Sequence, residues 1–168
     1  MRREAMKEKT FVCRPIGIIH SPFRDTDGMP IQTTGARGVP GTIAVDERYR
    51  EGLRDLDGFS HLILLYHFHL SRGYSLVVKP FLDDSERGLF ATRAPRRPNP
   101  IGLSVVRLVR VEGTLLHVED VDIVDGTPLL DLKPFVPLFD DRQDVKTGWL
   151  DGRGDNAFHT RADRRFRS

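Results

Sequence analysis

Several features that would assign this sequence to a class of protein at once are missing from it. A single cysteine, Cys13, excludes a disulfide framework and a thiolate zinc cluster. No stretch approaches the roughly 20 apolar residues that a membrane span needs, and the charged start lacks the apolar core of a signal peptide. A net charge of only +2 means that any nucleic-acid binding must depend on local patches. We therefore expect a soluble, cytoplasmic protein without a membrane partner.

What the chain does contain is the composition of one globular domain. Its 168 residues are 39% hydrophobic and 30% charged, which is enough for a real core. Cys13 alternates with apolar residues, and we interpret it as a packed core thiol. We expect a flexible N-terminus (1–10), a folded domain (11–138) and a polar extension (139–168). The extension ends in the basic run RADRRFRS, which we expect to be a solvated terminus or to add phosphate contacts to an RNA partner.

Strand patterns dominate the folded part. Short apolar, β-branched runs bounded by turn residues predict strands at 11–22, 41–46, 60–70, 75–82, 101–113, 114–124 and 129–137. The pattern of 101–113 indicates a bulge or bend, and Glu112-Gly113 predicts a hairpin turn. The best helix candidate is 46–59, capped by Asp46, with Leu53 and Leu56 on one face.

These elements predict a mainly β fold, a small β-barrel with one or two short helices. The sequence has no alternating strand–helix–strand units and no repeats. No glycine-rich turn links a strand to a helix, so a Rossmann domain is not expected. Residues 24–41 form a long loop rich in glycine and proline, and loops of that length in compact domains are often functional.

The stretch TRAPRRPNP (92–100) combines three arginines with three prolines. Proline fixes its own φ and disfavours helical geometry at the residue before it, so this segment is stiff and cannot be helical. It presents Arg93, Arg96 and Arg97 on a rigid scaffold, and arginine is suited to carboxylates and phosphates. Anion recognition and a rigid edge loop with solvated arginines are both open interpretations.

Histidines follow the strand pattern HLILLYHFH (61–69). In a strand His61, His67 and His69 share one face, and a His-x-His pair on a strand can ligate a metal. A metal-dependent hydrolase is therefore one alternative, and a histidine in a polar pocket or a structural role are the others.

Three aspartates lie close together in DVDIVDGTP (120–128). Asp120, Asp122 or Asp125 could accept hydrogen bonds from a ribose or a base amine. Asp-Gly-Thr-Pro is also an ordinary turn, and both interpretations stay open.

Four motifs together resemble one known family. FATRAPRRPNPIGLS (90–104), GFSHLILLYHFH (58–69), DGTPLLDLKPFVP (125–137) and IGIIHSP (16–22) recur in the order and approximate spacing of the TsaA-like, or TrmO, family. Members of that family are S-adenosylmethionine-dependent methyltransferases of N6 of threonylcarbamoyladenosine, next to the tRNA anticodon (position 37). They have a non-Rossmann β-barrel fold and act as homodimers. The resemblance thus implies the cofactor S-adenosylmethionine, a tRNA substrate and a homodimer, with no metal.

The resemblance also implies roles for individual residues. Arg93 is expected to bind the methionine carboxylate of the cofactor, and His69 is the candidate proton acceptor. The expected cofactor-binding residues are Gln32, Thr33, Thr34, His69, Leu70, Arg93, Leu103, Asp120, Val121, Asp122, Asp125, Gly126 and Thr127. The expected RNA-binding residues are Arg96, Arg97 and Asn99.

One departure from the family pattern affects the choice of substrate. Better-known bacterial members carry a second, smaller C-terminal domain, whereas about thirty residues follow the last motif here, so we expect a short form. Its basic tail could replace the RNA contacts of that domain, or the acceptor could differ. An S-adenosylmethionine-binding module without turnover is a further alternative to the enzyme.

Overall fold

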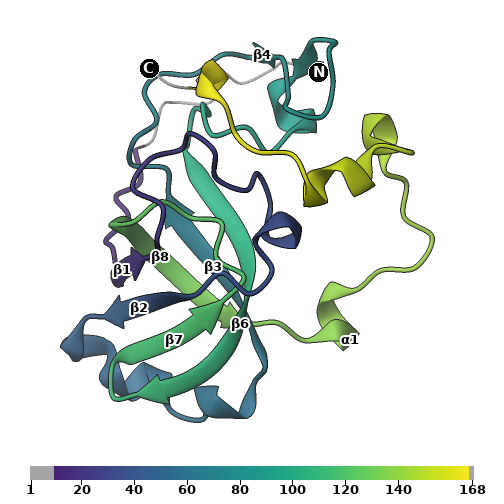
Figure 1. Cartoon of the computed structure of the whole chain (residues 1–168). Helices are drawn as coiled ribbons and strands as arrows, with labels where there is room; N and C mark the ends of the chain where they lie inside the picture. The colour runs from purple at the N-terminus through teal and green to yellow at the C-terminus, as the bar shows by residue number, and fades with distance from the viewer. Residues whose placement is uncertain (1–9, 167–168) are drawn as a thin grey trace, which may run out of the picture.

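A closed six-stranded β-barrel forms the body of the protein. The computed structural model describes residues 10–166, and Figure 1 shows the barrel with loops gathered at one end. Around the barrel the strands follow the order β1 (Gly17–His20), β2 (Gly41–Val45), β7 (Leu115–Glu119), β6 (Ile101–Glu112), β3 (His61–His67) and β8 (Thr127–Pro134). Adjacent strands pair antiparallel. The predicted mainly β, non-Rossmann fold is confirmed.

Alternation along the strands fills the barrel with apolar side chains. In β3, Leu62, Leu64 and Tyr66 are buried, while His61 and His67 are partly exposed on the outer face. The same alternation in the other strands supplies the remaining barrel core, which includes Ile19, Ile43, Val106, Leu116, Val118 and Leu129. Burial of this kind stabilises the fold by about 25 cal/mol per Å² of apolar surface.

The longest strand, β6, bends where the sequence predicted it to bend. The register between β6 and β7 shifts between Leu108 and Arg110, which is the expected bulge. The hairpin turn that follows uses Gly113 at φ 64°, a left-handed conformation that suits glycine. The bulge and the turn confirm the prediction for this hairpin.

Several predicted strands are shorter than expected. The strands predicted at 60–70 and 114–124 are confined to β3 and β7. The strand predicted at 75–82 is reduced to β4 (Val77–Val78), which pairs with β5 (Arg87–Gly88). The strand predicted at 11–22 begins only at Gly17. The interpretation of Cys13 as a core thiol is wrong, because Cys13 lies before the first strand and is exposed.

The segment predicted to be a helix at 46–59 is helical but not α-helical. It forms two 3₁₀ turns, Glu47–Leu53 and Leu56–Gly58, and Asp55 between them has φ 63°. The Asp46 carboxylate accepts from the Arg48 amide, as expected of a cap. Leu53 and Leu56 are buried against the barrel core, so the predicted apolar face is confirmed.

The C-terminal extension folds back onto the barrel. It starts within α1 (Pro137–Asp140) and continues through 3₁₀ turns at Gly148–Leu150, Gly154–Phe158 and Arg164–Phe166. Figure 1 shows it running up the outside of the barrel (green to yellow) to the end where β4 lies. The expectation of a solvated tail is wrong for the described part, because the backbone of Ala162 bonds with Gly28 and Met29 at 2.8 Å. The flexible start expected at 1–10 lies, apart from residue 10, outside the described residues.

Candidate functional site

A large cavity opens at the end of the barrel where the loops gather. Its volume is about 1210 Å³, above the roughly 300–1,000 Å³ typical of small-molecule sites. The end of β3 and the start of β6 contribute to its walls, together with three stretches that the sequence singled out. Its lining residues come from within 24–32, 66–72, 80–82, 90–97, 101–103, 122–127 and 149–166.

The cavity brings together about half of the cofactor-binding residues expected from the sequence. Its lining includes Gln32, His69, Leu70, Arg93, Leu103, Asp122 and Thr127. The other expected residues lie outside the lining; they are Thr33, Thr34, Asp120, Val121, Asp125 and Gly126. Of the expected RNA-binding residues, Arg97 lines the cavity, whereas Arg96 and Asn99 do not.

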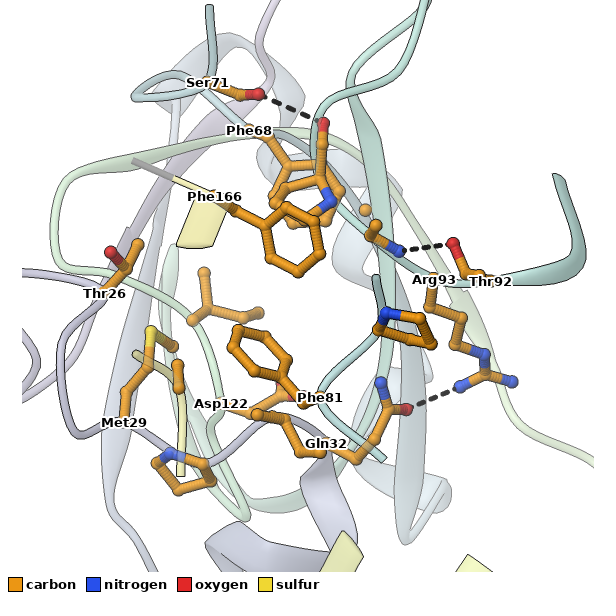
Figure 2. A pocket seen from close by; sticks show the side chains of 18 of the residues that line it. Thr26, Met29, Gln32, Phe68, Ser71, Phe81, Thr92, Arg93, Asp122 and Phe166 are labelled. Atoms are coloured by element: carbon orange, nitrogen blue, oxygen red, sulfur yellow. Dashed lines mark hydrogen bonds between the residues drawn. The ribbon is translucent and has the colours of Figure 1, made fainter. Parts of the chain in front are cut away.

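Arg93 marks one side of the cavity. Its Nη1 donates to Oε1 of Gln32 at 2.9 Å, so the proline-rich stretch and the long loop meet at this contact (Figure 2). The guanidinium is exposed, and its partner is a neutral amide, so its positive charge is available to an anion. This arrangement is suited to binding a carboxylate.

A chain of three polar side chains runs from the barrel interior to the cavity. The hydroxyls of Tyr66 and Ser104 are 3.0 Å apart, and Ser104 Oγ donates to Oδ1 of Asp122 at 2.6 Å. Burial raises the pKa of Asp122 to about 6, against the opposing hydrogen bond from Ser104. Burial also raises the pKa of Tyr66 far above its ordinary value, and the nearby Asp122 charge adds to this. A carboxyl group that titrates near neutral pH in a cavity is typical of a functional site.

Sequence reasoning missed Tyr66 and Ser104. The signal was available in the strand pattern, because Tyr66 shares the buried face of β3 with Leu62 and Leu64. A buried tyrosine hydroxyl needs a hydrogen-bond partner. The pairing of Leu64 with Ser104 and of Tyr66 with Gly102 supplies both the partner and the space for the ring.

His69 lies off the β3 strand and faces the cavity. After His67 the chain turns, with the His69 amide donating to the His67 carbonyl at 2.7 Å. The prediction that His61, His67 and His69 share one strand face is therefore wrong for His69. Instead Nδ1 of His69 lies 3.3 Å from Oγ1 of Thr127.

The contacts of Thr127 assign the tautomer of His69. The Thr127 hydroxyl donates to the Val124 carbonyl at 2.6 Å, so toward His69 it acts as an acceptor. Neutral His69 then carries its proton on Nδ1 and keeps Nε2 as an acceptor. Burial lowers the pKa of His69, and the neighbouring His67 lowers it further, so the neutral form dominates at pH 7.

The other two aspartates of the 120–128 segment hold loops in place. Asp120, at φ 68°, accepts from the Gly38 amide at 2.7 Å. Asp125 accepts from Nδ1 of His20 at 3.0 Å and from the Ser21 amide at 3.2 Å. Both contacts fix the loops next to the cavity, whereas Asp122 lines it directly.

The arginines of the proline-rich stretch differ in their surroundings. Nη1 of Arg97 donates to the carbonyls of Thr92 and Ala94, and its guanidinium lies over the ring of Phe90. Arg96 is half-buried, and within the described part of the chain its Nε has no hydrogen-bond partner. Asn99 is exposed.

Residues 10–166 offer neither a metal site nor a membrane-spanning helix. No three histidine, cysteine, aspartate or glutamate side chains in this part of the chain are grouped so that they could hold a metal ion. Within the same residues, no helix has both the length and the apolar character needed to cross a membrane.

Curated relatives of this chain carry names that refer to S-adenosylmethionine or to tRNA methylation. A probable S-adenosyl-L-methionine-binding protein of Pyrococcus abyssi is 52% identical over 91% of this chain and 83% of its own length. The tRNA (adenine(37)-N6)-methyltransferase of Escherichia coli is 33% identical, and the match covers 83% of this chain and 64% of that protein. The human protein of the same name is 31% identical over 94% of this chain but 37% of its own length. The chain thus spans most of the archaeal relative and less than two thirds of the other two.

Solved structures agree with these relatives. The crystal structure of TrmO from Pseudomonas aeruginosa superposes with a TM-score of 0.73 at 38% identity, covering 88% of this chain and 64% of that one. The sequence model of the tRNA-methyltransferase O N-terminal domain matches residues 18–141, which include all six barrel strands except the first residue of β1. This chain belongs to the tRNA-methyltransferase O N-terminal domain family.

Proposed function

We propose that this chain is an S-adenosylmethionine-dependent methyltransferase that modifies N6 of threonylcarbamoyladenosine at position 37 of tRNA. The observation that carries the proposal is the cavity in which Arg93, Gln32, Asp122 and His69 converge. Two of the relatives compared above bear the name tRNA (adenine(37)-N6)-methyltransferase, which supports the reaction and the substrate.

The residues of the cavity fit the cofactor. The exposed guanidinium of Arg93 matches the methionine carboxylate, and Gln32 holds that guanidinium in place. Asp122 offers a carboxyl group to the adenosine part, and Leu70 and Leu103 offer apolar contacts. Thr127 lines the cavity beside His69. The other expected cofactor-binding residues belong to the same stretches but lie outside the lining; they are Thr33, Thr34, Asp120, Val121, Asp125 and Gly126.

The protein's own task in the reaction is positioning and proton transfer. When bound, S-adenosylmethionine supplies an electrophilic methyl group, so that a nitrogen–carbon bond forms at N6 while the sulfur–carbon bond breaks. N6 loses one proton in the exchange, and His69 accepts it at Nε2. The Thr127 hydroxyl orients the His69 ring through Nδ1. Most of the rate should come from alignment of the reacting atoms.

The proposal includes a homodimer and a cytoplasmic location. Ile101, Leu103 and Leu70 line the cavity and are each about half exposed. A second copy of the chain could cover this apolar rim, which supports a homodimer. A tRNA substrate supports a cytoplasmic location. Arg96, Arg97 and Asn99 then lie on the loop next to the rim, available to RNA.

Binding of the cofactor without turnover is the main competing function, because archaeal relatives are named as S-adenosylmethionine-binding proteins. The test is transfer of a labelled methyl group from S-adenosylmethionine to tRNA that carries threonylcarbamoyladenosine, with unmodified tRNA as the control. We expect label at N6 of the modified adenosine alone. Saturable cofactor binding without label in either tRNA would favour the binding module, and label at another atom would require a different acceptor.

A further inference from the structure

The C-terminal segment 148–166 is part of the cavity wall, although it lies beyond the residues that match the family domain. Nε1 of Trp149 donates to the Ala91 carbonyl at 2.7 Å, and Arg153 pairs with Asp83 at 2.8 Å. At the other end Phe166 contacts Phe81 edge to face, with ring centroids 5.1 Å apart. Figure 2 shows these two rings beside each other in the cavity. The segment therefore closes a side of the cavity that the barrel leaves open.

The size of the cavity leaves room beyond the cofactor. Its volume of about 1210 Å³ exceeds the usual range for a single small molecule. The polar groups expected to hold the cofactor, Arg93 and Asp122, belong to the barrel and its loops. Methyl transfer requires a second molecule in contact with the first, and the side of the cavity built by the C-terminal segment is available for it.

Two aromatic rings line the cavity where the C-terminal segment meets residues 90 and 91. Phe90 is 74% exposed and Trp149 is partly exposed. The Trp149 indole donates to the carbonyl of Ala91, the residue that follows Phe90. Each ring has a guanidinium next to it: Arg97 lies 5.6 Å from the centre of the Phe90 ring, and Arg87 lies 5.7 Å from that of Trp149. Solvent-accessible rings with arginines beside them are the kind of surface on which single-stranded nucleic acids stack their bases.

The charges around these rings favour a polyanion. Asp83 is shared between Arg87 and Arg153, so one carboxylate faces two guanidiniums. Arg97 donates to neutral carbonyls, and Arg93 donates to a neutral amide. Around the two rings, the three guanidiniums of Arg87, Arg97 and Arg153 thus face the single carboxylate of Asp83.

We propose that Trp149 and Phe90 form a stacking surface for an unpaired nucleobase of the RNA acceptor, with Arg87 and Arg97 placed to contact its phosphates. This inference deepens the proposed function, since it assigns the acceptor side of the cavity. The occupant is single-stranded or loop RNA, because the bases of a duplex are stacked on each other and cannot reach the rings without being extruded.

Trp149 is the one tryptophan of the chain, so its fluorescence reports on this surface alone. The probe is an RNA hairpin with an adenosine in its loop, and a fully paired RNA duplex of equal length is the comparison. We expect the hairpin to quench Trp149 emission saturably, with the duplex binding more weakly and quenching little. Binding of the hairpin without any change in emission would overturn the proposal, as would equal quenching by the duplex.

Three variants separate stacking from folding. Trp149→Ala should weaken hairpin binding, followed by anisotropy of a labelled RNA, about 10-fold or more. Trp149→Phe keeps a ring but loses the bond to Ala91, and it should bind within about 3-fold of the wild type. Phe158→Ala removes an exposed ring of the same segment that does not line the cavity, and it should bind as the wild type does.

Cofactor titrations of the same proteins keep this inference distinct from the proposed function. Normal cofactor affinity in Trp149→Ala, together with weakened RNA binding, is the expected result. Wild-type RNA affinity in Trp149→Ala would refute the stacking surface and leave the methyltransferase proposal intact. A wild-type protein that stacks the hairpin on Trp149 but neither binds S-adenosylmethionine nor transfers methyl would refute the proposed function instead.

Discussion

The guanidinium of Arg93 donates to the side-chain oxygen of Gln32 at 2.9 Å, although 61 positions separate the two residues in the chain. The contact joins the stiff, proline-rich stretch to the long loop between β1 and β2 at the cavity. A neutral partner orients the guanidinium without cancelling its charge, which leaves Arg93 available to an anionic ligand.

The first prediction concerns Gln32→Glu. A carboxylate at this position would pair with Arg93 and repel the carboxylate of the cofactor, so we expect about 10-fold weaker binding of S-adenosylmethionine. Gln143→Glu makes the same charge change at an exposed position outside the cavity and should bind the cofactor normally. Equal affinities of both variants, measured by calorimetry, would mean that Arg93 does not bind a cofactor carboxylate.

The second prediction is that ionised Asp122 lowers the free energy of unfolding at neutral pH. In the folded state the pKa of Asp122 is raised to about 6, whereas in the unfolded chain the carboxyl group loses its proton near pH 4. Between these two pH values the folded state holds more protons than the unfolded chain, so the free energy of unfolding falls as the pH rises. Asp122→Asn keeps the shape of the side chain and should stabilise the protein by about 1–3 kcal/mol at pH 7, with little effect at pH 4. Denaturant unfolding at the two pH values measures this difference. Asp84→Asn, at an exposed site, should change stability little at either pH; a loss of stability in Asp122→Asn at pH 7 would contradict the account.

The third prediction uses the pH dependence of methyl transfer. His69 must be neutral to accept a proton, so the single-turnover rate should fall at acidic pH, below the lowered pKa of His69, and level off above it. His67→Gln removes the electrostatic contribution of His67 that helps to lower the pKa of His69. The acid limb, which is the part of the pH profile where the rate falls, should therefore move to higher pH. His69→Gln should slow transfer about 100-fold and abolish the limb. Persistence of the limb in His69→Gln, with its loss in Asp122→Asn, would assign proton acceptance to Asp122.

The fourth prediction tests the packing beneath the cavity. A Cβ on Gly102 would lie 2.2 Å from the ring of Tyr66, which is buried and cannot move freely. Gly102→Ala should therefore destabilise the protein by about 1–3 kcal/mol. Gly88→Ala places its methyl group in open space at a φ of −59° and is the matched control. Thermal unfolding that shifts equally in the two variants would mean that the Tyr66 ring has room to move.

The sequence predicts the barrel well because the barrel depends on local patterns. Alternation in β3, the bulge in β6 and the turn at Gly113 are each visible within a dozen residues. The proline-rich stretch likewise marks Arg93, because its stiffness is a local property.

The parts that could not be predicted depend on contacts between distant segments. The Tyr66–Ser104–Asp122 chain needs the register between β3 and β6, and the turn after His67 moves His69 off the strand. Cys13 follows an apolar pattern, but no strand pairs with its segment. The docking of Trp149 and Phe166 rests on a backbone carbonyl and on aromatic rings that no sequence pattern brings together.

The most direct test of the account is a calorimetric titration of S-adenosylmethionine into the wild-type protein and into Arg93→Ala, with Arg54→Ala as an exposed control outside the cavity. We predict saturable binding of about one cofactor per chain, at least 10-fold weaker in Arg93→Ala and unchanged in Arg54→Ala. Absence of binding to the wild type would contradict the proposed function, and full affinity in Arg93→Ala would contradict the site.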